Sequence, residues 1–339
     1  MTSALLSLPP GLRRRRRLAT FVAGGSILLV SLGMLTFGDA GFSPAEAFTA
    51  LWGVGDPGAV KVVQEWRLPR TVLALAIGAM LALSGALFQI VTRNPLGSPD
   101  ILGFSTGAMT GVLLIMAAGS VTVVGLTLSA FAGGLVAAVL VFALSARRGV
   151  RGYAVVVVGI GVTAMIGAVN TVLVIRADDL IARAAGVWAT GSLNGVDRSW
   201  VAPALIALVI GSLAAAWIAP ALHTQEFGED RSASLGARPL ATRWIAMVLG
   251  VALLSVATAV TGPISFVALA APQIARRVWR TGTIPLTASA ATGALLLAGC
   301  DLIAMRALAP TMLPTGIVTL CIGGVYLAWM LTRRSRSTS

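Results

Sequence analysis

The sequence predicts an all-α membrane protein with about ten transmembrane helices. Of its 339 residues, 57% are hydrophobic and only 11% are charged, and the mean hydropathy is +0.91. Too few polar side chains remain to cover a water-soluble protein of this size. Repeated apolar stretches of roughly 18 to 24 residues have the length at which a helix crosses the roughly 30 Å of bilayer hydrocarbon. We therefore expect the protein to lie in a lipid bilayer and to cross it with α-helices, not with the strands of a β-barrel.

Ten apolar stretches follow one another, and the whole chain, 1–339, is expected to form one transmembrane domain. The first stretch follows Arg13–Arg17 and is too long for a cleavable signal peptide, so we expect it to stay as an anchor. Segments 1–17 and 333–339 are expected to be cytoplasmic tails. The ten spans are placed near residues 18–38, 69–91, 101–118, 121–144, 153–175, 200–219, 241–260, 263–279, 284–304 and 314–332.

The distribution of basic residues predicts the orientation of these spans. An even number of spans puts both termini on one side of the membrane, and assigning that side to the cytoplasm places 18 of the 25 Lys and Arg residues inside. Positively charged residues are enriched in cytoplasmic loops. A location in the cytoplasmic membrane with both termini inside is therefore expected, and topology explains the net charge of +13 without nucleic acid.

The outer connection 39–68 contains two candidate elements. Ser43 precedes a short amphipathic run, Pro44–Trp52, which indicates an interfacial helix with an N-cap. Arg67 and Arg70 flank a proline at the start of the second span. These arginines either extend to the lipid headgroups or form a docking site for an acidic partner, to which Arg binds in a bidentate manner.

On the inner side, two segments interrupt the apolar pattern. Arg93–Asp100 contains two prolines and a glycine, so it is either an ordinary cytoplasmic turn or, as we prefer, a reentrant turn packed in protein. The loop 220–240 is the one long polar inner connection. It is either a solvated loop or a short helix that docks on a cytoplasmic partner through Glu229, Asp230, Leu235 and Gly236.

Several classes of function are not supported by the residues present. His223 is the only histidine, and Cys300 and Cys321 lie in apolar segments, so no catalytic or metal-binding constellation is visible and we expect neither an enzyme nor a bound cofactor. No Walker A sequence occurs, so ATP and Mg²⁺ would be used by a separate ATPase subunit. An ion-coupled secondary transporter would place carboxylates near the midplane. Asp301 instead lies near a span end, where we expect it to pair with Arg306.

Several of these segments resemble the FecCD family of permeases, which includes the vitamin B12 and ferric-siderophore importers. Details such as Glu65-Trp66 and Gly323-Gly-Val-Tyr326 are most similar to its ferric-enterobactin subgroup. The matching segments are Arg67-Leu-Pro-Arg70, Ser84-Gly85-Ala86, Arg93-Asn-Pro-Leu-Gly-Ser-Pro-Asp100, Trp188 with Gly191-Ser-Leu-Asn-Gly195, Gly262-Pro-Ile-Ser-Phe-Val267, Ala271-Pro-Gln-Ile-Ala-Arg-Arg277 and Leu313-Pro-Thr-Gly-Ile-Val-Thr319.

The resemblance implies the permease subunit of an ABC importer. Such a subunit pairs with a second permease subunit, here expected to be a paralogue, although a homodimer is an alternative. Two ATPases bind below and a substrate-binding protein docks above. The expected cargo is a ferric siderophore of the enterobactin-like catecholate class, with another iron chelate, haem or cobalamin as alternatives.

The resemblance also assigns roles to individual residues. It places Arg67, Arg70 and Arg306 at the binding-protein surface and the loop 228–239 at the ATPase. The family motifs contain Asn94, Pro95, Gly97, Pro272 and Gln273, and Gln273 stands where many relatives carry His. Asn170 and Thr171 are candidates for lining the pathway, and packing between helices is the alternative for both.

Overall fold

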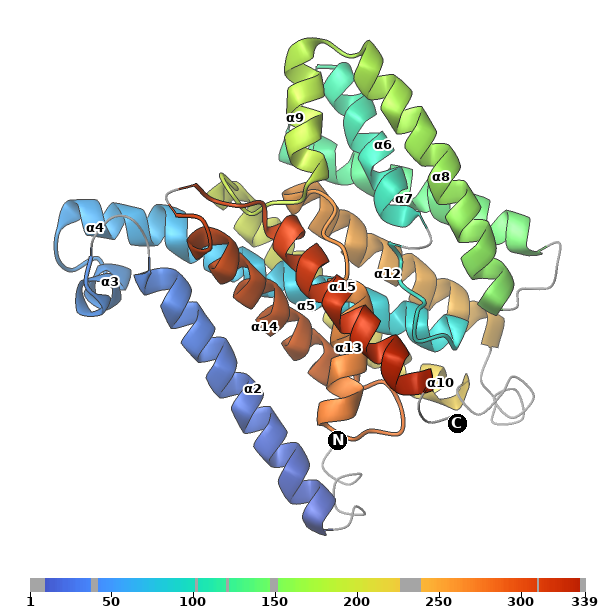
Figure 1. Cartoon of the computed structure of the whole chain (residues 1–339), viewed down its shortest axis with the longest axis horizontal. Helices are drawn as coiled ribbons and strands as arrows, with labels where there is room; N and C mark the ends of the chain where they lie inside the picture. Colours follow the sequence, from blue (N-terminus) through green and yellow to red (C-terminus); the bar gives the residue numbers. More distant parts are fainter. Residues whose placement is uncertain are drawn as a thin grey trace.

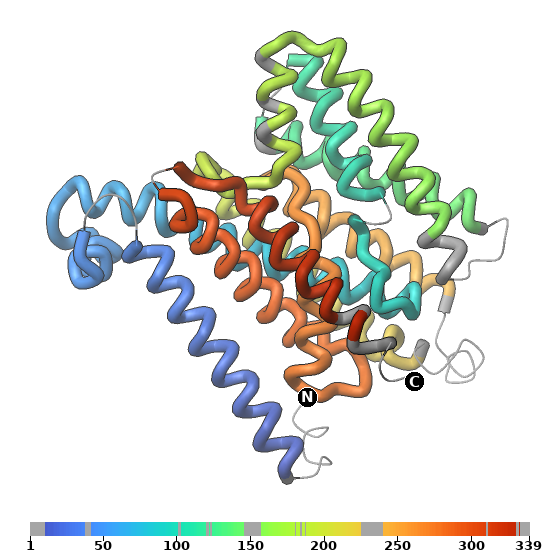
Figure 2. Tube along the Cα trace, viewed as in Figure 1, coloured from blue at the N-terminus to red at the C-terminus, as the bar shows by residue number. Residues whose placement is uncertain are grey.

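The structure, a computed structural model, describes residues 10–37, 42–100, 103–119, 122–146, 152–225, 239–309 and 311–335. Within these ranges all regular structure is helical, and the predicted all-α fold class is confirmed. Figures 1 and 2 show the helices packed into one bundle. Helices that match the ten predicted spans are α2 (Pro10–Thr36), α5 (Leu68–Thr92), α6 (Phe104–Ala117), α7 (Val123–Ala146), α8 (Gly152–Arg176), α10 (Val201–Gln225), α12 (Pro239–Thr261), α13 (Val267–Val278), α14 (Leu286–Arg306) and α15 (Thr315–Ser335).

Helix α13 is shorter than the span predicted over 263–279. Among the described residues, seven helices are long and apolar enough to cross a bilayer, and α6 and α15 contain shorter apolar stretches. α13 has 12 residues, which extend about 18 Å at 1.5 Å per residue. Gly262 and Phe266 have φ values of +72° and +69°, outside the right-handed helical region. The prediction of a full span was wrong because residues 262–266 form an irregular entry to a half-length helix.

The two ends of the bundle are defined by contacts between helix termini. The end of α2, the start of α5, the end of α14 and the start of α15 meet at one end. The start of α2 meets the end of α13 at the other, where the Arg16 guanidinium donates to the carbonyl oxygens of Trp279 and Arg280. We call these the outer and the inner end, following the orientation that the basic residues predict.

Helix α5 is the centre of the bundle. In its most apolar stretch of 18 residues, 89% of the residues are buried inside the protein. The corresponding share is 17% for α8 and 22% for α10. Glycines bring its backbone against its neighbours: a Cβ on Gly78 or Gly293 of α14 would fall on the carbonyl oxygen of the other, and Gly85 lies against the Ala268 carbonyl of α13. Small residues allow such close approach in membrane helices. α5, α13 and α14 therefore form one tightly packed unit.

Helices α6, α7 and α8 form a second group, with α9 (Asp179–Ala189) beside them at the top of Figure 1. Gly107 of α6 and Gly133 of α7 lie backbone to backbone. The Asn170 side chain of α8 accepts a hydrogen bond from the Thr110 hydroxyl at 2.6 Å and donates to the Thr106 carbonyl at 3.0 Å. α12 contacts both this group and α5.

The outer connection between α2 and α5 folds into three short helices. These are α3 (Pro44–Leu51), α4 (Pro57–Lys61) and the π-helix η1 (Val62–Arg67), which continues directly into α5. Ser43 and Glu46 form a capping box: the Glu46 amide donates to the Ser43 hydroxyl, and the Ser43 amide donates to the Glu46 carboxylate at 2.8 Å. The N-cap predicted at Ser43 is confirmed.

Candidate functional site

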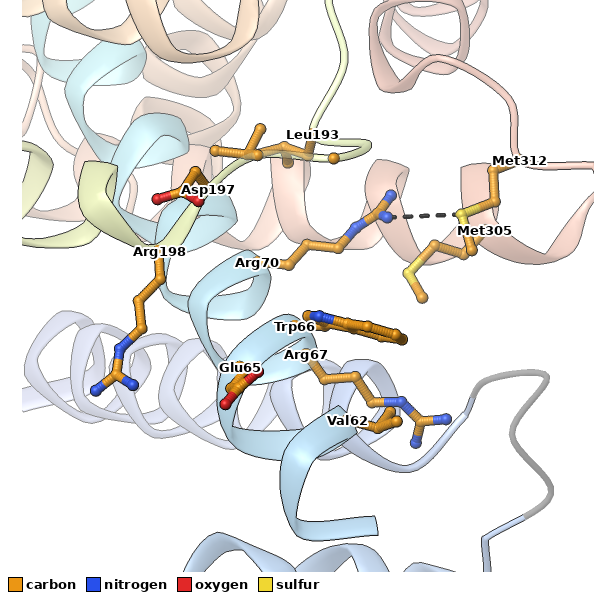
Figure 3. Close-up of a pocket in the computed structure, with 12 residues that line it drawn as sticks. Val62, Glu65, Trp66, Arg67, Arg70, Leu193, Asp197, Arg198, Met305 and Met312 are labelled. Atoms are coloured by element: carbon orange, nitrogen blue, oxygen red, sulfur yellow. Dashed lines mark hydrogen bonds between the residues drawn. The ribbon is translucent and has the colours of Figure 1, made fainter. Parts of the chain in front are cut away.

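A cavity of about 770 Å³ opens at the outer end of the bundle. Its wall combines the η1–α5 junction, the loop that follows α9, and the end of α14 (Figure 3). Apolar atoms come mainly from Trp66, Leu193, Met305 and Met312, of which Trp66 is 64% exposed. An open apolar surface rimmed by charged residues is typical of a site for another molecule.

Arg70 lies in the cavity wall, but its guanidinium is held by the protein itself. Its Nε is 2.7 Å from Asp301 Oδ2 and its Nη2 is 2.9 Å from Asp301 Oδ1, which makes a bidentate ion pair. Nη2 also donates to the Asn194 side-chain oxygen at 2.7 Å. The Thr315 hydroxyl donates to Asp301 Oδ1 at 2.6 Å. We call Arg70, Asn194, Asp301 and Thr315 the outer polar cluster.

The outer polar cluster corrects the predicted pairing of Asp301 with Arg306. Both residues are on α14, but a separation of five residues turns a helix by about 140° beyond a full turn, so their side chains lie on different faces. Asp301 is fully buried and faces α5. Arg306 is exposed and its guanidinium lies 5.7 Å from the centre of the Phe37 ring. Charges buried in the bilayer require partners, and Asp301 finds its partner on α5.

Arg67 has a structural contact of a different kind. Its side chain is only 6% exposed, and Nη1 donates to the carbonyl oxygens of Leu35 and Thr36 at 2.8 and 3.1 Å. These carbonyls belong to the last turn of α2, where peptide oxygens lack partners within the helix and the helix dipole is negative. Arg67 therefore fastens the outer end of α2 to the start of α5.

The loop after α9 positions the opposite wall of the cavity. Gly191, at φ +67°, lies against the backbone of α13's entry segment, and its carbonyl oxygen accepts from the Gly316 amide at 2.8 Å. The Ser192 amide donates to the Thr261 carbonyl at 2.7 Å. Glycine tolerates this backbone conformation without a Cβ penalty. The loop is thus fixed to the start of α15 and the end of α12.

Arg198 and Trp66 are exposed cavity residues for which the sequence predicted no role in docking; Trp66 was noted only as part of the Glu65-Trp66 match to the family. Arg198 begins the short helix η2 (Arg198–Trp200), and Figure 3 shows it on the side of the cavity opposite Met305 and Met312. Its neighbour Asp197 accepts a hydrogen bond from the Ser199 amide at 2.7 Å, which lowers the pKa of the Asp197 carboxyl. The predicted topology leaves seven basic residues outside, Arg198 among them, and this location is the signal that could have identified it.

The family-motif residues gather at the inner end. Asn94 Oδ1 accepts from the Leu96 amide, Gly97 lies against Thr92, and Gly97 to Pro99 are buried. The turn is therefore packed against protein, as predicted for Arg93–Asp100. Pro272 is buried inside α13, and the neighbouring Gln273 side chain donates to Gln89 of α5 at 2.5 Å.

Other predicted site residues lie apart from these two regions. Asn170 is 5% exposed and joins α8 to α6, so its contacts are those of helix packing. Thr171 is exposed on α8 and its hydroxyl donates to the Gly167 carbonyl. Glu229, Asp230, Leu235 and Gly236 lie outside the described residues. Within the described part of the chain, no three His, Cys, Asp or Glu side chains are grouped so that they could hold a metal ion.

Comparison with known proteins gives matches over nearly the whole chain. The model of the FecCD transport family matches residues 26–333. The ferric enterobactin transport system permease protein FepG of Escherichia coli is 40% identical over 95% of this chain and 98% of its own length. The probable siderophore transport system permease protein YfhA of Bacillus subtilis is 33% identical over 92% of each chain.

A solved structure also matches the fold. It is described as an inward-facing conformation of a metal-chelate type ABC transporter, and it superimposes with a TM-score of 0.81 over 92% of this chain and 98% of its own. The two sequences are 24% identical, so this likeness concerns the fold. The ten-helix arrangement, the motif residues and the family match agree, and the chain belongs to the FecCD transport family.

Proposed function

We propose that this chain is the transmembrane permease subunit of an ABC importer that carries a ferric siderophore across the cytoplasmic membrane by ATP-driven alternating access. The observation that carries the proposal is the 40% identity to the E. coli ferric enterobactin permease over almost the full length of both chains. An enterobactin-like catecholate complex is therefore the proposed cargo. Relatives named for ferric citrate and for cobalamin, at 34% identity, favour those chelates as the second candidates.

The proposed assembly contains a second permease subunit, a paralogue in our proposal, two ATPases at the inner end and a binding protein at the outer end. α8 exposes an apolar surface of the kind that lipid or a second membrane subunit covers, formed by Val157, Ile160, Val169, Val172 and Ile175. The loop 220–240 is the proposed ATPase contact. Both termini are proposed to be cytoplasmic.

Uptake of radiolabelled iron complexes tests the cargo. Cells that lack the chain are expected to lose uptake of the catecholate complex and to regain it when the gene is restored. Uptake of ferric citrate and of cobalamin, measured in the same cells, is expected to be unchanged. If catecholate uptake persists while citrate or cobalamin uptake disappears, the cargo assignment is wrong.

We propose that the binding protein docks over the 770 Å³ cavity. Trp66 and Met312 offer apolar contacts, and Arg198 and Arg306 offer exposed guanidinium groups to carboxylates of the partner. Arg67 and Arg70 border the same site, but their guanidinium groups also hold α2 and Asp301. Charge reversal at Arg67 or Arg70 therefore affects folding as well as docking. The exposed Arg198, and Arg306 beside the Phe37 ring, are the positions to test.

Reversing the exposed charges is expected to weaken docking. In the assembled importer, Arg198→Glu combined with Arg306→Glu should raise the binding-protein concentration that half-maximally stimulates ATP hydrolysis by at least about tenfold, because attraction becomes repulsion. Arg176→Glu combined with Arg183→Glu is the matched control, since both arginines are exposed and neither lines the cavity nor adjoins a lining residue, whereas Arg198 lines it and Arg306 follows the lining residue Met305. Equal effects of the control and the double variant, or no effect of either, would contradict this docking site.

A further inference from the structure

A second, smaller cavity of about 170 Å³ lies at the inner end, between the ends of α5 and α13. The carboxamide side chains of Gln89 and Gln273 form its floor, and Arg93 and Arg276 stand at its rim. Thr283 and Gly282 close it on the side of the loop after α13. None of the functions proposed above uses this cavity.

The floor of the cavity is a built polar surface within an apolar bundle. Gln89 is 2% exposed and Gln273 is 7% exposed. The Gln273 nitrogen donates to the Gln89 oxygen at 2.5 Å, and the Gln89 nitrogen donates to the Leu269 carbonyl at 3.0 Å. Each carboxamide nitrogen carries two hydrogens. These contacts fix both side chains and leave each with a further N–H to donate.

The rim carries two positive charges that no described residue neutralises. Among the residues that the structure describes, the guanidinium groups of Arg93 and Arg276 form neither an ion pair nor a hydrogen bond. None of the described residues that line the cavity is Asp or Glu. Two guanidinium groups at the rim of one cavity repel each other, and an anion bound between them would remove that repulsion.

The cavity lies at the inner ends of two apolar helices, where lipid headgroups are expected. Arg93, at φ +51°, ends the long apolar helix α5. Trp279 caps the end of α13, three residues before Gly282. Its indole N–H donates to the hydroxyl of Thr20 on α2 at 3.2 Å. Tryptophan is enriched at membrane–water interfaces. Basic pockets between helices at this level on the cytoplasmic side are suited to anionic headgroups.

We propose that this cavity binds the phosphate group of an anionic phospholipid from the leaflet at the inner end. Two guanidinium groups, the carboxamide N–H groups and the Thr283 hydroxyl supply donors around one small space, enough for both non-bridging oxygens of a phosphodiester to accept several hydrogen bonds each. The place of the cavity at the ends of two apolar helices favours a lipid phosphate over a soluble carboxylate. The bound lipid would join the end of α5 to the end of α13. Because Gln89 and Gln273 complete the floor, the glutamine at position 273 acts as part of this site.

Binding of phosphatidylglycerol to the purified full chain, measured by native mass spectrometry, tests the proposal. In Arg93→Gln combined with Arg276→Gln, the apparent Kd for the tightest-bound phosphatidylglycerol is expected to rise at least about tenfold, because two charge-assisted contacts are lost. Arg277→Gln combined with Arg280→Gln is the matched control, since it also removes two positive charges at the inner end, from residues that do not line the cavity; the Arg277 guanidinium lies 5.3 Å from the Trp329 ring centre. If the control weakens phosphatidylglycerol binding as much, the effect reflects the overall positive charge of the inner end and not this cavity, and the proposal is overturned.

A second pair of variants keeps both arginines and blocks the site instead. A Cβ at Gly282 would meet no atom within 4 Å, so Gly282→Glu is expected to fold, to place a carboxylate beside the arginines and to weaken phosphatidylglycerol binding by at least about tenfold. Gly282→Gln, the neutral control, should weaken it much less. Equal binding by Gly282→Glu and Gly282→Gln would overturn the proposal.

Two further measurements distinguish a lipid phosphate from other anionic groups that could bind the two arginines. If inorganic phosphate raises the Tm of the purified chain as much as phosphatidylglycerol does, free phosphate is the ligand and the lipid assignment falls. If the double arginine variant binds phosphatidylglycerol normally but no longer co-purifies with the ATPase subunit, the arginines contact an acidic surface of that partner and the proposal falls.

Discussion

Replacing Asp301 with alanine is expected to lower the free energy of unfolding by about 3 to 5 kcal/mol, because it leaves the Arg70 guanidinium at the membrane boundary without its counter-charge. Asp301 is fully buried and accepts from Arg70 through both carboxylate oxygens and from Thr315. Loss of this residue therefore removes the polar contacts that α14 makes here with both α5 and α15. The effect can be measured by unfolding the detergent-solubilised chain with increasing SDS.

A double variant separates the charge from the packing. Arg70→Met combined with Asp301→Leu replaces the ion pair with apolar side chains, and such replacements are often close to neutral. We expect the double variant to lose less than half of the stability lost by Asp301→Ala. An equal loss in both proteins would show that the ion pair is not the reason for the instability.

Replacing Gly293 with valine is expected to cost about 3 kcal/mol or more. A side chain at this position of α14 falls on the Gly78 carbonyl oxygen of α5. Backbone cannot move aside by changing a rotamer, so the cost lies at the upper end of the range for overpacked cores. Gly85, which lies against the Ala268 carbonyl, should be equally intolerant.

Gly299 provides the matched control on the same helix. A Cβ there meets no atom within 4 Å, so Gly299→Ala is expected to change the free energy of unfolding by no more than about 1 kcal/mol, the size of the difference in helix propensity. The level of folded protein recovered from membranes and the SDS midpoint measure both variants. Similar behaviour of Gly293→Val and Gly299→Ala would contradict the backbone contact between α5 and α14.

The sequence was sufficient to predict the helices because hydrocarbon thickness sets their length. It also predicted the cap at Ser43, where the capping residue and its acidic partner are three residues apart. It failed at α13, since apolar composition alone does not distinguish a full span from an irregular segment followed by a half-length helix. Local pattern is therefore reliable for the elements that the bilayer itself constrains.

The site was predicted less completely, because it depends on contacts between distant segments. Arg67 and Arg70 look alike in the sequence, yet one holds the carbonyls of α2 and the other holds Asp301 of α14. Trp66 and Arg198 line one cavity only because the loop after α9 is fixed beside the start of α5. The five-residue separation of Asp301 and Arg306 was the one available signal that these two residues face different directions.

The glycine contacts of α5 have a consequence for how the permease changes shape. Two backbones in direct contact can neither compress nor slide without large cost, so α5, α13 and α14 are expected to travel together as a rigid body during each transport cycle. Rearrangement is then confined to the helices with mostly exposed surfaces, α8 and α10 among them. In the proposed importer, the conformational change driven by ATP hydrolysis would therefore be taken up by these outer helices and not within the α5, α13 and α14 unit.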